Sequence, residues 1–133
     1  EASAELRRGR TVSEVSGAES VLSDDVVTVP VADVAQKLSI PVSRVHQLVR
    51  DGQLLSLRRD RATVVPADFL DDEHGIVKGL SGTITVLRDG GYPDDDILRW
   101  LFADDDSLPG TPVAALQAGR HKEVKRRAQA MAF

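Results

Sequence analysis

Apolar residues recur at helical spacing in two neighbouring segments near the start of the chain. In the first segment, four of them fall at positions i, i+3, i+4 and i+7: Val31, Val34, Ala35 and Leu38. This spacing predicts an amphipathic helix with one buried face. Pro41 interrupts the pattern, because the residue before a proline is pushed away from helical angles. A second amphipathic helix is predicted over about residues 42–50, and Gly52 ends it.

Short apolar runs on either side of these helices predict extended chain. The run at residues 26–29, ended by Pro30, predicts a short strand. Residues 54–57 and 62–65 predict two further strands, joined by a four-residue loop at 58–61. The predicted order is helix, sharp turn, helix and two-stranded hairpin, which is the order of elements in a winged helix-turn-helix.

The second half of the chain has a mainly helical pattern. A helical turn is predicted at residues 67–70 and a linker at 71–75, followed by helices at 80–89, from Pro93 onward, at 112–118 and at about 120–130. Thr111 suits the N-cap of the third of these helices. The helix after Pro93 carries the largest apolar face, which we expect in the core: Ile97, Leu98, Leu101 and Phe102, with Trp100 partly buried beside them.

These elements predict a mainly α fold with a small β-hairpin wing, in which a winged helix-turn-helix is followed by a helical C-terminal domain. Residues 1–25 are polar and hold no period for long, which predicts a mostly disordered tail. The expected divisions are this tail, a winged helix-turn-helix domain at 26–72 and a helical C-terminal domain at 73–133.

Charge is distributed unevenly along the 133 residues, whose net charge is −4. Five arginines gather within the segment of helix, turn, helix and hairpin: Arg44, Arg50, Arg58, Arg59 and Arg61. Aromatic residues make up only 4% of the chain, which argues against a single-strand binder that stacks bases. No cysteine is present, so disulfides, thiol catalysis and zinc–cysteine sites are excluded. With no long apolar run or signal-peptide pattern, we expect a cytoplasmic protein that contacts no membrane.

Polar side chains of the second predicted helix gather on one arc. On a helical wheel with about 100° per residue, one arc is apolar and contains Val42, Val45, Leu48 and Val49. The opposite arc carries Ser43, Arg44, His46, Gln47 and Arg50, and no carboxylate. Glutamine suits adenine, and arginine suits guanine or a phosphate. We therefore predict that this face enters the major groove of duplex DNA, while Arg58, Arg59 and Arg61 of the hairpin loop hold the backbone or minor groove.

The same stretch resembles a known class of domain. VPVADVAQKLSIPVSRVHQLVRDGQLLSLRRDRATVVPADFL is similar to the excisionase and MerR-type winged helix-turn-helix, with the step into the wing at residues 50–54. That class often has serine or threonine where Pro41 stands, which leaves the start of the recognition helix open by a residue or two. DGGYPDDDILRWLF and KRRAQAMAF resemble the C-terminal domain of a family of small actinobacterial DNA-binding proteins that are substrates of serine/threonine kinase L.

The resemblance also implies a phosphorylatable threonine in the N-terminal tail. Thr11 is the only threonine of that tail, and Arg7, Arg8 and Arg10 precede it. A serine/threonine protein kinase is therefore an expected partner, and Thr11 is the expected phosphorylation site. On this interpretation the protein is a transcriptional or nucleoid regulator that phosphorylation of the tail controls.

Two alternatives stay open at this stage. The segment TPVAALQAGRHKEV distantly resembles the toxin-binding segment of antitoxin domains, so the C-terminal domain could bind a protein partner or simply complete the core. The three histidines, His46, His74 and His121, lack metal-ligand spacing. Residues 94–96 and 104–106 are aspartate runs explained by a helix start and a loop, with a Mg²⁺ site as the lesser alternative. We expect no catalytic residue, no metal and no cofactor.

Overall fold

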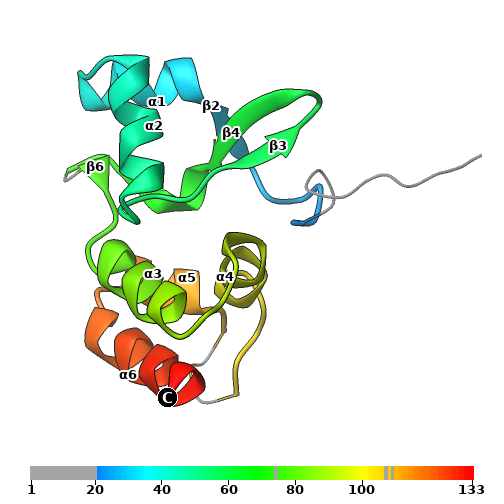
Figure 1. Ribbon diagram of the computed structural model, residues 1–133, viewed down its shortest axis with the longest axis vertical. Coiled ribbons are helices and arrows are strands. Elements are labelled where there is room, and N and C mark those ends of the chain that lie inside the picture. The colour runs from blue at the N-terminus through cyan, green and yellow to red at the C-terminus, as the bar shows by residue number, and fades with distance from the viewer. Residues whose placement is uncertain (1–20, 74, 107, 109) are drawn as a thin grey trace, which may run out of the picture.

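The computed structural model describes residues 21–73, 75–106, 108 and 110–133. Its elements follow one another in this order: β2 (Thr28–Pro30), α1 (Val31–Leu38), α2 (Val42–Arg50), β3 (Leu57–Arg59), β4 (Ala62–Pro66), the 3₁₀ turn η2 (Ala67–Phe69), β5 (Leu70–Asp71), β6 (Gly75–Ile76), α3 (Leu80–Asp89), α4 (Asp94–Leu101), α5 (Pro112–Gln117) and α6 (His121–Ala132). Figure 1 shows the strands and the first two helices above a layer formed by the last four helices. The predicted fold class is confirmed.

The sharp break between α1 and α2 is a helix-ending turn followed by a proline. Ser39 takes a left-handed backbone conformation with φ 59°. The amide of Ile40 donates to the carbonyl of Ala35 at 3.0 Å, and the amide of Ser39 donates to Gln36 at 3.2 Å. These two bonds form a Schellman motif, which satisfies the last carbonyls of α1. Pro41 is then the N-cap of α2, which covers Val42–Arg50 as predicted.

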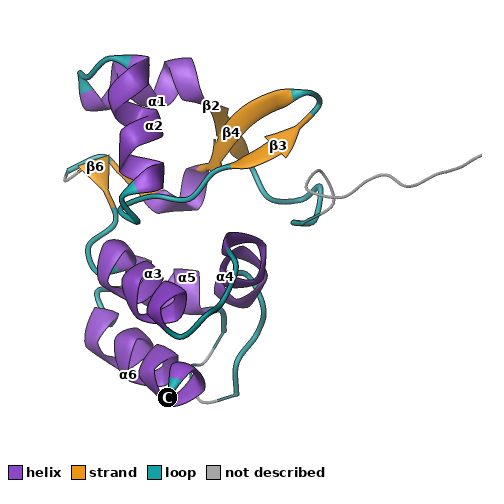
Figure 2. Cartoon of the chain, in the orientation of Figure 1, coloured by secondary structure: helices purple, strands orange, loops and turns teal. Residues whose placement is uncertain are grey.

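The wing belongs to a three-stranded antiparallel sheet with the order β2-β4-β3 (Figure 2). Leu57 pairs with Val64 and Arg59 pairs with Ala62, so only Asp60 and Arg61 lie outside the strands. Both have positive φ, 53° and 67°, as in a two-residue type I′ turn. The predicted four-residue loop is therefore wrong. The twist of a type I′ turn matches that of the flanking strands, which extends their pairing through Arg59.

Two further segments differ from the sequence prediction. The expected linker at 71–75 includes a short antiparallel pairing, in which Leu70 faces Ile76 and Asp71 faces Gly75. At the other end, Val21 and Leu22 are each only 6% exposed and belong to the hydrophobic core. The ordered domain therefore starts no later than Val21, and not at residue 26. Most of the predicted tail, including Thr11, lies outside the described residues.

The apolar face of α4 is buried as predicted, with one exception. Ile97, Leu98 and Leu101 are at most 1% exposed, and Trp100 is partly buried beside them. Phe102 is also only partly buried, so its assignment to the fully buried core is corrected. Its ring packs on that of Phe69 from the winged half, with centroids 5.7 Å apart. The buried residues of both halves form one continuous cluster.

Candidate nucleic-acid interface

Helix α2 separates its apolar and polar residues as the sequence predicted. Val45 and Leu48 are buried against the rest of the winged half. The five polar residues of the predicted arc are all exposed and lie on one face: Ser43, Arg44, His46, Gln47 and Arg50. Val42 was expected on the buried arc, but it is 43% exposed, because the first turn of α2 extends beyond the core.

The polar side chains on this face of α2 are available to bind a ligand. None of its five side chains forms a hydrogen bond or an ion pair with another residue of the part of the chain that the structure describes. The helix contains no aspartate or glutamate, so no carboxylate of α2 itself neutralises Arg44 or Arg50. Its donors can therefore bind base edges or phosphates without first giving up an internal partner.

Two of the predicted wing arginines lie at the tip of the hairpin. Arg58 is exposed in β3, and its guanidinium donates to the carbonyl of Arg61 at 3.0 Å. Arg61 is exposed in the turn itself. Cations at such a tip can contact phosphates beside a groove that α2 occupies.

Arg59 has a different position from the other two. Its guanidinium donates to the carbonyls of Val26 at 2.7 Å, Ser23 at 3.0 Å and Leu22 at 3.4 Å. The side chain thus fastens the segment before β2 to the wing next to its turn, and it would lose these bonds in order to contact a phosphate. The structure does not bring the three wing arginines together, and the candidate interface therefore retains only Arg58 and Arg61.

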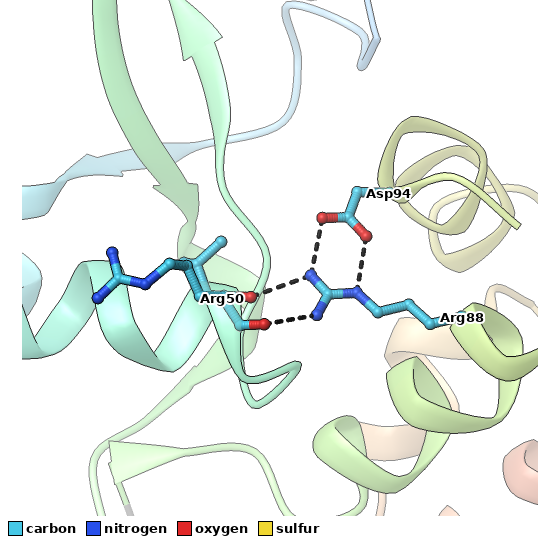
Figure 3. Close-up of polar contacts among 4 residues, drawn as sticks. Arg50, Arg88 and Asp94 are labelled. Atoms are coloured by element: carbon cyan, nitrogen blue, oxygen red, sulfur yellow. Dashed lines mark hydrogen bonds and ion pairs between the residues drawn. The ribbon is translucent and has the colours of Figure 1, made fainter.

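The C-terminal end of α2 has a contact that the sequence did not indicate. Arg88, in the last turn of α3, donates from Nη1 to the carbonyl of Arg50 at 3.1 Å and from Nη2 to that of Val49 at 2.9 Å (Figure 3). The same guanidinium binds both carboxylate oxygens of Asp94, at 2.9 and 2.8 Å. A cation is thus placed at the negative end of the α2 dipole and is itself held by an acid from the first turn of α4.

Gly52 makes room for this contact. Its φ of 78° allows a second Schellman motif, in which the amide of Gly52 donates to Val49 and that of Gln53 donates to Leu48. A β-carbon at Gly52 would lie 3.2 Å from Nη1 of Arg88. Glycine at this position therefore permits both the backbone conformation and the close approach of the arginine.

The apolar residues of helix α5 face the interior of the protein. Its apolar residues Val113, Ala115 and Leu116 are buried in the core. Thr111 caps the helix by accepting the amide of Ala114 at 3.2 Å, as predicted. Gln117 donates to the carbonyl of Asp68 at 3.0 Å and so joins α5 to the η2 turn. These contacts support the alternative in which the segment completes the core.

The described residues contain neither a metal cluster nor a membrane helix. Across residues 21–73, 75–106, 108 and 110–133, no three histidine, aspartate or glutamate side chains gather as metal ligands would. Three acids of the aspartate runs are paired with arginines: Asp94 with Arg88 at 2.8 Å, Asp96 with Arg99 at 2.8 Å and Asp105 with Arg127 at 3.2 Å. In the same part of the chain, no helix has the length and apolarity required to cross a bilayer.

Comparison with known proteins agrees with this architecture. A family model described as "DNA-binding protein Rv2175c, wHTH domain" matches residues 14–70, and one described as "Rv2175c C-terminal domain of unknown function" matches residues 77–132. The chain is 41% identical to the DNA-binding protein Rv2175c of Mycobacterium tuberculosis over 134 residues, which cover 92% of each protein. The chain belongs to the Rv2175c family.

A solved relative extends the agreement to three dimensions. The NMR structure of Rv2175c shares 42% identity with this chain and superimposes with a TM-score of 0.78, covering 85% of this chain and 86% of the other. A winged helix-turn-helix followed by a helical C-terminal domain is thus the architecture of this Rv2175c family member. Both the predicted architecture and the predicted resemblance to a family of DNA-binding proteins are confirmed.

Proposed function

We propose that the protein binds duplex DNA, with α2 in the major groove and the β3–β4 wing on the neighbouring backbone. The observation that carries this proposal is the exposed face of α2, whose polar side chains have no partner among the described residues. The relative from M. tuberculosis is named a DNA-binding protein, which supports the same function.

The dimensions and chemistry of the face match those of the groove. A helix with its side chains is about 10–12 Å across, close to the width of the major groove. Gln47 can bind adenine through two hydrogen bonds, and Arg44 or Arg50 can bind guanine in the same way. Ser43 and His46 add shorter donors and acceptors on the same face. Arg58 and Arg61 supply salt-dependent contacts with phosphates.

A regulatory role follows from this mode of binding. A protein that occupies chosen duplex sites controls the access of other proteins to the neighbouring DNA. The role that we propose is therefore that of a transcriptional or nucleoid regulator.

We further propose control by a serine/threonine kinase acting on Thr11. The segment that follows the tail is held against the wing, because Arg59 donates to the carbonyl of Leu22 at 3.4 Å. The segment from Thr11 to Val21 can span at most about 35 Å, which sets the greatest distance from Val21 at which a phosphate on Thr11 can act. The phosphate adds about −1.5 to −2 charges, which repel DNA or pair with Arg7, Arg8 and Arg10.

The test is a fluorescence-anisotropy titration with a duplex selected from a random pool and with a scrambled duplex. Both should bind, the selected duplex more tightly, and log K should fall linearly with log salt. A double variant in which alanine replaces both Arg58 and Arg61 should show a salt slope whose magnitude is lower by about two. The control is Arg99→Ala, which removes a cation of α4 that Asp96 already neutralises. The absence of saturable binding to any duplex would refute the function, and a tight protein partner on residues 78–133 would favour the antitoxin-type alternative.

Phosphorylation is tested in the same assay. The protein is treated with a serine/threonine kinase, the modified residue is mapped by mass spectrometry, and DNA is titrated at two salt concentrations. Modified Thr11 should weaken binding, most strongly at low salt, where charge is least screened. Modification confined to Ser3, Ser13, Ser16, Ser20 or Ser23 would refute the assignment to Thr11. Unchanged affinity after modification of Thr11 would refute the mechanism.

A further inference from the structure

We propose that the C-terminal domain sets the sequence specificity of DNA binding through Arg88, a positioning residue that holds the C-terminal end of α2. This inference rests on the proposed function. Arg88 is the side chain through which α3 contacts backbone carbonyls of the recognition helix, and it does so with two hydrogen bonds. The C-terminal domain thereby acquires a role in DNA recognition without contacting DNA itself.

The acceptors on α2 are groups that an isolated helix would leave without a helical partner. The last carbonyls of any helix lack an amide donor from the following turn and carry the negative end of the dipole. Val49 and Arg50 lie at this end of α2, and the guanidinium of Arg88 binds both of their carbonyls, that of Val49 in addition to its bond from the amide of Gly52. A planar cation with several N–H donors is suited to this position, because it can bind two diverging acceptors at once.

Asp94 fixes the guanidinium from the opposite side. Two parallel hydrogen bonds, Nε to Oδ1 at 2.9 Å and Nη2 to Oδ2 at 2.8 Å, form a bidentate pair. The side chains of Arg88 and Asp94 are 27% and 40% exposed, so water only partly screens the pair. Four hydrogen bonds therefore define the position of the guanidinium between α2 and α4.

The contact acts on the turn of α2 that carries a base-reading candidate. Figure 3 shows the side chain of Arg50 extending away from Arg88, while its carbonyl points toward Arg88. The direction of the Arg50 side chain depends on the backbone that Arg88 holds, and Gln47 lies one turn earlier on the same face. Hydrogen bonds to base edges require close alignment, whereas attraction to phosphates acts over a longer range. A small shift of this helix end should therefore reduce specific binding more than nonspecific binding.

Two substitutions test the connection from its two sides. Arg88→Lys keeps the charge at the end of the helix but removes the planar group that binds four acceptors. Asp94→Asn removes the charge that holds the guanidinium. The matched control is Asp95→Asn, which alters the same first turn of α4 at an exposed residue that does not contact Arg88. All variants are measured well below their unfolding temperatures, with folding confirmed by circular dichroism.

The readout is the ratio of affinities for the selected and the scrambled duplex. Arg88→Lys and Asp94→Asn should lower this ratio about tenfold, which is within the range for loss of one base contact. Asp95→Asn should leave it unchanged. A merely structural role would reduce the active fraction and weaken both duplexes equally, so an unchanged ratio overturns the inference.

Amide hydrogen exchange provides a second measurement that needs no DNA. The amides of Asp51, Gly52 and Gln53 bond to carbonyls in the last turn of α2. They should exchange several-fold faster in Arg88→Lys, while the amides of α1 keep their rates. Unchanged exchange would overturn the proposed hold on α2. If the wild-type protein bound no duplex, the proposed function would be refuted. If the wild-type and variant proteins discriminated equally well between the two duplexes, the inference alone would be refuted.

Discussion

Arg58 donates a hydrogen bond to the backbone carbonyl of Arg61, at 3.0 Å, across a wing turn of only two residues. The bond supports a turn whose second residue has the unfavourable φ of 67°. A side chain in the left-handed conformation costs roughly 1 kcal/mol relative to glycine. The wing thus has an arginine where a glycine would fold more readily, as expected where a residue serves binding.

Replacing Arg61 separates its backbone strain from its contribution to DNA binding. Arg61→Gly should raise the free energy of unfolding by up to about 1 kcal/mol, because it relieves the strain, and should lower the salt slope of DNA binding by about one. Arg61→Ala should lower the slope equally without the gain in stability. Urea denaturation and anisotropy titrations measure the two quantities. A wild-type slope in either variant would remove Arg61 from the interface.

Arg59 should matter for stability and not for the salt slope. Arg59→Met keeps an unbranched apolar stem but leaves the carbonyls of Leu22, Ser23 and Val26 without their donor. The expected loss is about 1–3 kcal/mol in the free energy of unfolding, the usual cost of an unsatisfied polar group. Lys122→Met, at an exposed position on α6, is the control and should change stability by less than about 0.5 kcal/mol. A variant as stable as wild type would show that the segment before β2 is held by other contacts.

Gln47 should contribute to sequence discrimination. Gln47→Ala is expected to cost about 1–3 kcal/mol on the selected duplex and little on the scrambled one. Gln129→Ala, an exposed glutamine on α6, serves as the comparison and should affect neither duplex. Equal losses on both duplexes would make Gln47 a phosphate contact, and no loss would remove it from the interface.

Leu98 and Phe102 should differ in their contributions to the core. Leu98 is fully buried, so Leu98→Ala should cost about 2–5 kcal/mol. Phe102 is only partly buried, and Phe102→Ala should therefore cost less than the roughly 3–5 kcal/mol typical of a buried phenylalanine. Urea denaturation followed by tryptophan fluorescence and by circular dichroism gives both values. A greater loss for Phe102→Ala would mean that its contact with Phe69 dominates the packing between the two halves.

The pKa of Asp72 provides a test by pH. A hydrogen bond from Lys37, at 2.6 Å, and the charge of that lysine hold the pKa of Asp72 below its ordinary value. Because the folded pKa is the lower one, any stabilisation by this pair is present above the ordinary pKa and is lost as pH falls through the folded pKa. An NMR titration should show the pKa of Asp72 returning to its ordinary value in Lys37→Gln. Lys122→Gln should leave the pKa unchanged, and an unshifted pKa in wild type would contradict the pair.

Local sequence signals were sufficient for most helices. The bounds of α1, α2 and α3 follow from apolar spacing interrupted by proline and glycine, which act within a few residues of where they stand. The exposed face of α2 follows from the same periodicity. Its assignment to DNA contact stays a prediction, because exposure does not identify what a side chain binds.

Features that depend on distant contacts were missed. The Asp60-Arg61 turn lacks the glycine that usually marks a two-residue hairpin, and the β5–β6 pairing is too short to produce a period. Arg88 looks like an ordinary cation of a last helical turn, and its acceptors are backbone carbonyls that sequence spacing does not reveal. The burial of Val21 and Leu22 likewise depends on packing formed by residues far along the chain.

The contact between Phe69 and Phe102 limits how this protein can evolve. A DNA-binding domain joined by a loose tether can be exchanged whole between proteins, bringing a new specificity with it. Here the aromatic contact and the continuous core join the winged half to the helices that support it. A lineage that acquires a new operator should therefore change side chains on the exposed face of α2, while the junction between the halves stays constant. Gene fusions that transplant the winged half alone should be rare, since the transplanted domain would expose its junction to water.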